Sequence, residues 1–156
     1  MRTIRPPSKA NNAKVLRLLA SGSTVVSSHV ASLRKACVTY LETGGDPSRN
    51  KPLQLPTSVA AELDELYKAK RVRDGLQWIK TYRSAKGLSH CPLCGNNGPT
   101  TLEHYLPRAH FSEFTIFSWN LIPSCGTCNS KRNKYASTPT TSTPLIHPYL
   151  DDAAYD

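Results

Sequence analysis

Apolar residues recur at helical spacing through the first half of the chain. The clearest run is separated by four, three, four and three positions and comprises Val26, Val30, Leu33, Cys37 and Tyr40. This spacing puts one apolar stripe along an amphipathic helix, which Gly44-Gly45 ends. Similar spacing predicts helices from Asn11 and from about Thr57, and a fourth that ends at about Ser84. The first half is therefore expected to be helical.

The second half changes to short apolar runs with prolines between them. Residues 116–122 predict a strand, or a strand and a turn, that Pro123 breaks. Residues 125–135 have helical character. The chain is thus expected to be α+β, with a helical region over 1–86 and a compact module over 87–136. A Thr/Pro-rich linker and a C-terminal segment would follow over 137–156.

The charge balance narrows the class of partner. The formal net charge is +9, from 20 Lys and Arg against 11 Asp and Glu. This excess favours nucleic acid over a membrane surface, because no stretch is apolar enough to enter a bilayer. Seven cations crowd the end of the helical region: Lys68, Lys70, Arg71, Arg73, Lys80, Arg83 and Lys86. They form either a solvated helical face or a surface that contacts phosphates.

Four of the five cysteines form two C-x-x-C pairs, Cys91/Cys94 and Cys125/Cys128. The basic N-terminus has no apolar segment behind it, which favours a cytoplasmic, reducing setting. There, paired C-x-x-C motifs indicate zinc rather than the alternative of two disulfides. Four thiolates leave zinc no open position, so this zinc would be structural. Cys37 lies on the apolar helix stripe and is interpreted as a small buried hydrophobe rather than a ligand or redox thiol.

Three motifs lie between and beside the cysteine pairs. They read LEHYLP at 102–107, WNLIPSC at 119–125 and CNSKRNK at 128–134. An acid and a histidine that are adjacent in a strand point to opposite faces, so Glu103 and His104 share a site only near a strand end, which Pro107 marks. In combination the motifs resemble the HNH endonuclease family, in the variant where asparagine replaces the final histidine. The resemblance implies a ββα-metal fold, two strands and a helix around one metal ion.

The resemblance also implies a role for each matching residue. His104 would be the general base that activates water for attack on a DNA phosphodiester. Glu103 would bind the single divalent ion, and Asn120 would hold the motif and help orient the base. Asn129 and Asn133 are four residues apart, on one helical face, and would complete the ion site. Oxygen ligands favour Mg²⁺ or Mn²⁺ there, although the two amides could instead serve as helix caps.

Other polar residues surround these motifs. The cations expected to contact phosphate are Arg108, Lys131, Arg132 and Lys134. His90 and His110 flank the motifs and are expected to face solvent. Near the C-terminus, His147, Asp151 and Asp152 lack metal-ligand spacing and indicate surface packing rather than a second metal site. The C-terminal segment regains apolar residues and is expected to pack back on the body.

Two alternatives to an enzyme stay open at this point. A zinc ribbon that binds nucleic acid without cutting needs the cysteines and the cations, but not Glu103, His104 and Asn120. A subunit that docks on a partner through its helical half is the other. CPLCG, LEHYLP and NLIPSC with HPYLD behind them look similar to HNH proteins of bacterial anti-phage systems such as Septu. That looser resemblance implies an ATPase subunit as a partner.

Overall fold

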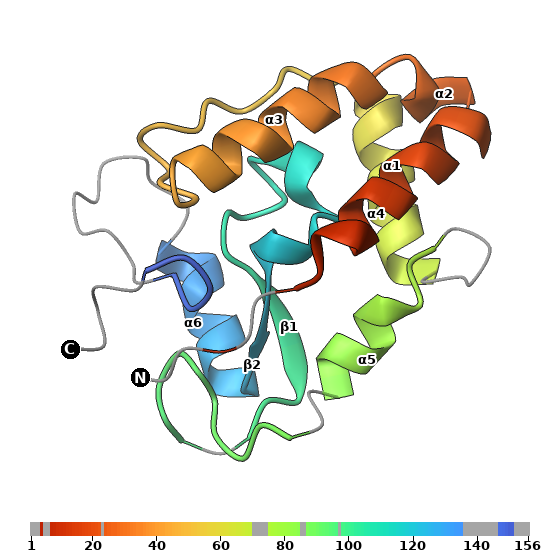
Figure 1. Ribbon diagram of the computed structural model, residues 1–156. Helices are drawn as coiled ribbons and strands as arrows, with labels where there is room; N and C mark the ends of the chain where they lie inside the picture. Colours follow the sequence, from red (N-terminus) through yellow and green to blue (C-terminus); the bar gives the residue numbers. More distant parts are fainter. Residues whose placement is uncertain are drawn as a thin grey trace.

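The computed structural model describes residue 4 and residues 7–22, 24–69, 75–84, 87–96, 98–135 and 147–151, without the side chains at 9, 10, 24, 84 and 131–135. Helices form the first part of the chain, and a two-stranded sheet with a further helix forms the second (Figure 1). The α+β class expected from the sequence is confirmed.

Five helices precede the sheet: α1 (Lys9–Gly22), α2 (Thr24–Ser27), α3 (Val30–Glu42), α4 (Thr57–Ala69) and α5 (Trp78–Ser84). The apolar run that begins at Val26 forms two helices, so the prediction of one is wrong. Ser28 Oγ donates to the Val25 carbonyl at 3.3 Å, and His29 Nδ1 lies 3.3 Å from the same oxygen. The His29 backbone N–H donates to the Val26 carbonyl instead. Side chains that compete for helical carbonyls end the first helix here.

Gly75 shapes the chain before α5, where the fourth helix was expected to be interrupted. Its φ is +69°, in the left-handed region, and a Cβ there would lie 2.7 Å from Leu18 Cδ1 of α1. The left-handed backbone conformation therefore favours glycine, and a larger residue would also displace the end of the Leu18 side chain. Residues 70–74, including Val72 of the predicted apolar face, lie outside the described residues.

The sheet consists of β1 (Thr101–His104) and β2 (Leu121–Ser124), which pair antiparallel, and α6 (Gly126–Tyr135) follows β2 directly. Pro123 does not break the strand as predicted, because it lies inside β2 opposite Leu102. The Tyr105 N–H donates to the Asn120 carbonyl at 2.8 Å. Hydrogen-bonded positions alternate along an antiparallel pair, so Pro123 falls where no N–H is needed.

The segment 116–122, expected to be a strand or a strand and a turn, contains a 3₁₀ turn followed by the start of β2, and a second 3₁₀ turn precedes it. The two turns are η1 (Ser112–Phe114) and η2 (Ser118–Asn120), and both are largely buried. The β2 strand therefore begins only at Leu121. This compact loop between the strands brings Thr115 and Asn120 close to the end of β1, as described below.

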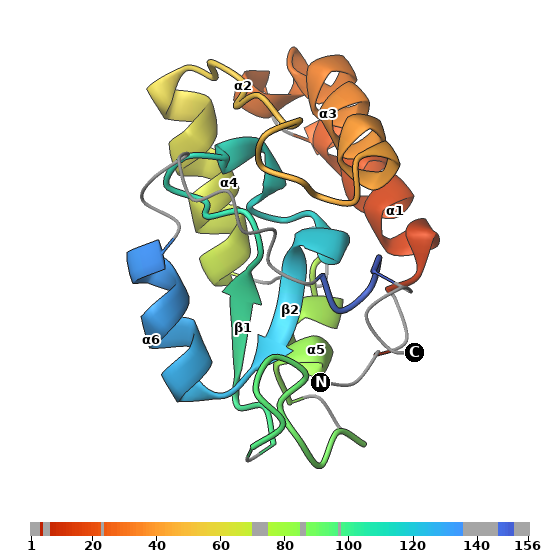
Figure 2. The ribbon, with the colours of Figure 1, turned by 90° about the vertical axis from the view of Figure 1, so that its left-hand side faces the viewer.

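Two apolar clusters form the core. The first joins helices α1–α5 to the sheet: Val15, Leu19, Val26, Val30, Leu33, Val59, Leu63, Tyr67, Leu76, Ile79, Leu102, Ile116 and Leu121. The second packs Tyr40 of α3 against the loop between the strands and includes Phe114, Phe117 and Trp119. Helices α1–α4 lie at one end of the sheet, whereas α6 and α5 lie along its two sides (Figure 2). Residues of the expected helical region and of the expected module thus share one core.

Residues 147–151 pack back onto this body, as the sequence indicated. Tyr149 belongs to the second apolar cluster, and its hydroxyl donates to the Leu121 carbonyl at 2.8 Å. His147 is fully buried, so the expectation of surface packing at that residue is wrong. The linker over 137–146 and Asp152 lie outside the described residues.

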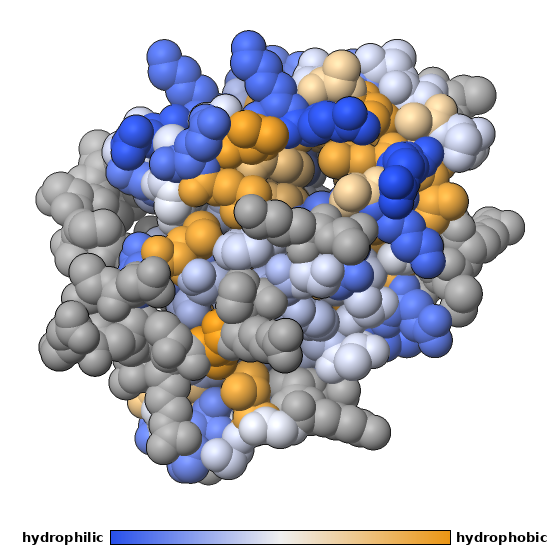
Figure 3. Space-filling model, in the orientation of Figure 1, coloured by the Kyte–Doolittle hydropathy of each residue, from blue (hydrophilic) through white to orange (hydrophobic). Residues whose placement is uncertain are grey.

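The surface is mixed in character. Hydrophilic side chains gather over α1 and α3 on the face in Figure 3, with hydrophobic patches between them. Among the described residues the exposed large apolar side chains are Val25 and Val38. No helix within the described ranges is both long and apolar enough to cross a membrane.

Candidate metal centre and cleft

The four cysteines of the two C-x-x-C pairs come together. Their sulfur atoms all lie within 4.8 Å of one another, and those of Cys94 and Cys125 are 3.7 Å apart. A tetrahedral zinc with Zn–S bonds of about 2.3 Å holds its sulfurs about 3.8 Å apart. The fifth position of the first turn is Gly95, with φ +75° and its N–H bonded to the Cys91 carbonyl. The cluster could therefore bind a structural zinc.

The thiols carry no disulfide. All five cysteines are free in the structure. The backbone N–H of Cys128 lowers the pKa of the Cys125 thiol to about 7, which favours the thiolate at that residue, whereas burial raises the pKa of the Cys128 thiol. By contrast, burial and then the charge of Glu113 raise the pKa of Cys37 to about 12. Cys37 packs against the second apolar cluster, in line with its interpretation as a small hydrophobe.

A cleft of about 450 Å³ lies along β1. Glu103 and His104 both line it although they are adjacent in the strand, because the cleft follows all four residues of β1. Asn129 reaches it from α6, and Arg108 from the loop after β1. The structure thus brings four of the sequence-predicted site residues to one cavity. Further lining residues are Tyr67, Arg83, Thr100, Thr101, Leu102, Pro107 and Ala109.

His104 is almost completely enclosed, with 8% of its surface exposed. Its Nε2 lies 3.0 Å from the Thr115 carbonyl, which only accepts, so Nε2 carries the proton and Nδ1 has the free lone pair. Burial lowers the pKa of His104 to about 4, and the bond to Thr115 opposes that shift in part. The ring is therefore neutral at pH 7 and can accept a proton at Nδ1, with less driving force than an exposed histidine.

Asn120 does not line the cleft but holds the loops around it. It is fully buried, and its Oδ1 accepts from the Leu106 N–H at 2.7 Å. Its Nδ2 donates to the carbonyls of Leu106 and Phe114, at 3.0 and 3.3 Å. Leu106 follows His104 by two residues, and Phe114 precedes the residue whose carbonyl holds the His104 ring. One carboxamide therefore ties the two segments that position His104.

The α6 residues are only partly described. The Asn129 Nδ2 donates to the Leu102 carbonyl at 3.3 Å, and its Oδ1 accepts no hydrogen bond from the described residues. Asn133, Lys131, Arg132 and Lys134 lie on α6, but their side chains are outside the described part. Among described His, Cys, Asp and Glu side chains, the four cysteines are the one group of three or more that could hold a metal.

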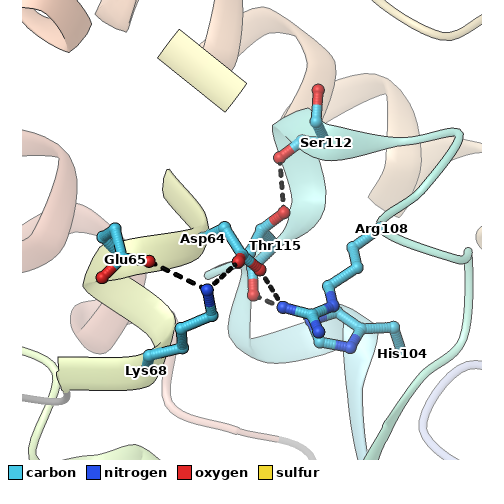
Figure 4. A network of polar contacts seen from close by, with 7 residues as sticks. All are labelled: Asp64, Glu65, Lys68, His104, Arg108, Ser112 and Thr115. Atoms are coloured by element: carbon cyan, nitrogen blue, oxygen red, sulfur yellow. Dashed lines mark hydrogen bonds and ion pairs between the residues drawn. The ribbon is translucent and has the colours of Figure 1, made fainter. Parts of the chain in front are cut away.

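Helix α4 supplies contacts that the sequence did not reveal. Tyr67 packs its ring 4.9 Å from that of His104, and Arg108 lies 5.5 Å over the same Tyr67 ring. Asp64, one turn earlier, forms ion pairs with Arg108 and with Lys68 (Figure 4). Tyr67 follows the apolar spacing of α4 and was interpreted only as core. No local signal distinguishes a core tyrosine from one that packs on a histidine far along the chain.

The crowded cations of residues 68–86 separate into groups. Lys68 pairs with Asp64 and Glu65 on the exposed face of α4, and Lys80 is exposed. Arg83 of α5 lines the cleft beside Glu103 and His104. Lys70, Arg71, Arg73 and Lys86 lie outside the described residues. Of the three cations in this group that the structure describes, Arg83 is the one that lines the cleft.

The remaining histidines differ in their environments. His90 and His110 are exposed, as expected, and neither lines the cleft. His147 is buried against Tyr40, and its backbone N–H donates to the Asp151 carboxylate. Within the described residues His147 and Asp151 belong to no metal-binding group.

Comparison with known proteins shows a similarity to a phage protein. No family model matches the chain, and no solved structure matches it. The chain is similar to protein ea31 of Escherichia phage lambda, with 34% identity over 112 residues. The match covers 66% of this chain and 38% of that protein, so the chain spans well under two thirds of its relative's length.

Proposed function

We propose that this chain is a metal-dependent endonuclease of the HNH type, which hydrolyses phosphodiester bonds of DNA. One observation carries the proposal: Glu103 and His104 of β1 and Asn129 of α6 line a single cleft, which Tyr67 of α4 and Arg83 of α5 also line. The family resemblance of LEHYLP, NLIPSC and CNSKRNK supports the same assignment. A zinc ribbon that only binds would not need an acid and a neutral histidine in that cleft.

His104 is the proposed general base. Its Nε2–H is engaged by the Thr115 carbonyl, which fixes the ring and leaves Nδ1 to take a proton from water. The ring is held on another side by Tyr67. A water activated in this way would attack the phosphorus atom, and the 3′ oxygen would leave. Preorganisation by three separate segments of the chain favours this role over that of a solvated surface histidine.

Glu103 and Asn129 are the proposed ligands of a divalent ion, with Asn133 one turn further along α6. A carboxylate and amide oxygens fit a hard cation such as Mg²⁺ or Mn²⁺ better than zinc. The Asn129 Oδ1, which accepts no hydrogen bond from the described residues, is consistent with that use. When bound, the ion supplies charge neutralisation on the phosphate and on the leaving oxygen. The structural zinc at the cysteine cluster would be separate from it.

DNA is the proposed substrate because cations line the cleft of a chain with net charge +9. Arg83 and Arg108 both reach it. The Arg108 side chain is 43% exposed in its pair with Asp64, so it can exchange that partner for a phosphate at small cost. Lys131, Arg132 and Lys134 would extend the same contact along α6. We also propose, from the looser resemblance, a cytoplasmic anti-phage role with an ATPase partner.

Plasmid cleavage tests the proposal. We expect the wild type to cut DNA with Mg²⁺ or Mn²⁺, to stop in EDTA, and to recover when the divalent ion is restored. His104→Ala should lower the rate by roughly 10²- to 10⁴-fold, the usual contribution of a general base. His110→Ala is the matched control, since His110 is exposed and outside the cleft, and it should cut like the wild type.

The same experiment can overturn the assignment. Wild type that binds DNA tightly but cuts with neither ion, alone or with a candidate ATPase, would be a nucleic-acid-binding zinc module instead. Equal cleavage by the wild type and His104→Ala would remove His104 from the proposed mechanism. The zinc content of the same samples shows whether cleavage stopped because EDTA removed the divalent ion or because it removed the structural zinc.

A further inference from the structure

A buried line of hydrogen bonds joins the C-terminal segment to the loops around the cleft. The His147 Nε2 lies 2.9 Å from the Tyr40 hydroxyl, which lies 3.1 Å from the Asn120 Oδ1. None of these three side chains has exposed surface. His147 comes from the C-terminal segment, Tyr40 from α3 and Asn120 from the end of η2. Tyr40 is 107 residues from His147 and 80 residues from Asn120 in the sequence.

The proton positions along this line follow from its neighbours. The Tyr149 backbone N–H donates to the His147 Nδ1 at 3.2 Å, so Nδ1 is unprotonated and Nε2 carries the hydrogen. Nε2–H therefore donates to the Tyr40 oxygen. The Tyr40 hydroxyl in turn donates to the Asn120 Oδ1. Both hydrogen bonds therefore point the same way, from His147 through Tyr40 to Asn120, and hydrogen bonds in such a chain strengthen one another.

Asn120 is the point where this line meets the proposed site. Its Oδ1 accepts both from Tyr40 and from the Leu106 N–H, and its Nδ2 donates to the Leu106 and Phe114 carbonyls. A primary amide that flipped by 180° would place its donors against Tyr40 and Leu106, which also donate. The hydroxyl of Tyr40, which also lies 3.5 Å from the Trp119 carbonyl, therefore reinforces the carboxamide orientation that the Leu106 N–H requires.

Packing alone does not explain the polar groups of Tyr40 and His147. The Tyr40 ring makes edge contacts with Phe114 and Phe117, at centroid distances of 4.9 and 5.2 Å, which phenylalanine could make equally well. A hydroxyl and an imidazole in an apolar core need partners, and an unpaired one costs roughly 1–3 kcal/mol. Their presence is accounted for if they hold the Asn120 carboxamide.

We infer that His147 and Tyr40 are positioning residues, which act through Asn120 to fix the two segments that orient His104. The catalytic part of this inference rests on the proposed nuclease function, whereas its structural part does not. The C-terminal segment is then a working part of the site, although none of its residues lines the cleft. The chain offers a conservative variant and a matched control to test this.

The test compares Tyr40→Phe with Tyr149→Phe. Each removes one buried tyrosine hydroxyl, but the hydroxyl of Tyr149 bonds to the Leu121 carbonyl and not to Asn120. We expect Tyr40→Phe to lower kcat roughly 10- to 100-fold, as small displacements of a catalytic group do, with KM little changed. Tyr149→Phe should keep kcat within about twofold at similar loss of stability in urea.

His147 supplies the second arm. His147→Leu should resemble Tyr40→Phe, and His147→Gln, whose amide can donate from the Nε2 position, should recover most of kcat. Amide hydrogen exchange follows the Leu106 N–H in every variant, whether or not the wild type cuts DNA. Protection of that amide should fall in Tyr40→Phe and His147→Leu and stay high in Tyr149→Phe.

The outcomes separate this inference from the proposed function. If Tyr40→Phe cuts like Tyr149→Phe and the Leu106 amide is equally protected in both, the positioning role is wrong while the nuclease stands. If the wild type never cuts, the nuclease proposal fails, and the Leu106 protection alone decides whether the line fixes the loop.

Discussion

At the residue scale, buried polar groups govern the behaviour of this site. Asn120 is completely enclosed and all its hydrogen-bonding atoms are used, so it fixes geometry. His104 has one nitrogen engaged and one free, so it is held in place and still able to react. Glu113, nearby in η1, is a third case: its Oε1 accepts from the Leu53 N–H, and its Oε2 is buried with no hydrogen bond among the described residues.

Glu113 leads to a prediction of pH-dependent stability. Burial raises the pKa of its carboxyl above the ordinary value of 4.5, although the Leu53 N–H opposes the shift. The folded state then holds this proton more tightly than the unfolded state. Between the ordinary and the raised pKa the folded state binds more protons, so this group's contribution falls as pH rises through that window.

Glu113→Gln should remove this dependence, because glutamine does not titrate. The free energy of unfolding in urea, measured from pH 4 to pH 7, should fall with pH for the wild type relative to Glu113→Gln. Glu65→Gln is the control, since Glu65 has a 70% exposed side chain. A wild-type minus Glu113→Gln difference that is constant over this range would contradict the buried, raised-pKa carboxyl.

At the element scale, the turns that carry the cysteines set where β1 and α6 begin. Cys91 and Cys94 lie on the turn before β1, while Cys125 and Cys128 bracket the start of α6. The Cys125 N–H donates to the Cys91 sulfur at 3.4 Å. Zinc at this cluster would join the first turn to the start of the helix that carries Asn129, and so support the cleft without reacting there.

Removing one thiol should therefore remove the metal. Wild-type protein should contain about one zinc per chain by atomic spectroscopy, as a closed four-cysteine site holds one ion, and Cys91→Ser almost none. Cys91→Ser should also lose stability, because binding of the ion is coupled to folding. Cys37→Ser is the matched control and should keep its zinc, because Cys37 packs against the second apolar cluster and is not one of the four clustered cysteines. If Cys37→Ser lost its zinc while Cys91→Ser kept it, the four-cysteine assignment would be wrong.

At the scale of the whole molecule, one apolar cluster connects the helices to the strands of the site. Leu63 of α4 is fully buried in it with Leu102 of β1 and Leu121 of β2. Tyr67, one turn after Leu63, contacts His104. The helices thus act as part of the wall of the cleft, and their stability should be coupled to that of the sheet.

Leu63→Ala tests this coupling. A buried leucine truncated to alanine costs about 2–5 kcal/mol of stability. We expect that loss both in urea unfolding followed by circular dichroism and in hydrogen exchange of the β1 and β2 amides. Val38→Ala on the exposed face of α3, where the side chain is 50% exposed, should change either measurement by no more than about 0.5 kcal/mol. Unchanged exchange in the sheet of Leu63→Ala would mean that helices and sheet unfold independently.

The sequence by itself determined the features that depend on neighbouring residues. The spacing of apolar residues predicted the helices, and the two C-x-x-C pairs predicted the thiol cluster that the structure forms. The wrong predictions from the sequence were also local. One expected helix is divided at Ser28 and His29, and Pro123, expected to break the strand, lies inside β2 at a position that needs no N–H. In each case the outcome depended on which carbonyl or strand lay opposite, which spacing does not report.

Only the tertiary structure decided which distant residues meet at the cleft. Arg83 lines it, Tyr67 packs on His104, and His147 reaches Asn120 through Tyr40. Each of these residues is consistent with an ordinary solvent-facing or core position when only its own segment is considered. Periodicity relates residues within one element, whereas contacts between elements depend on how all of them pack together. The motifs therefore carry the proposed chemistry, whereas the packing of the helices and of the C-terminal segment determined which residues surround His104 and Asn120.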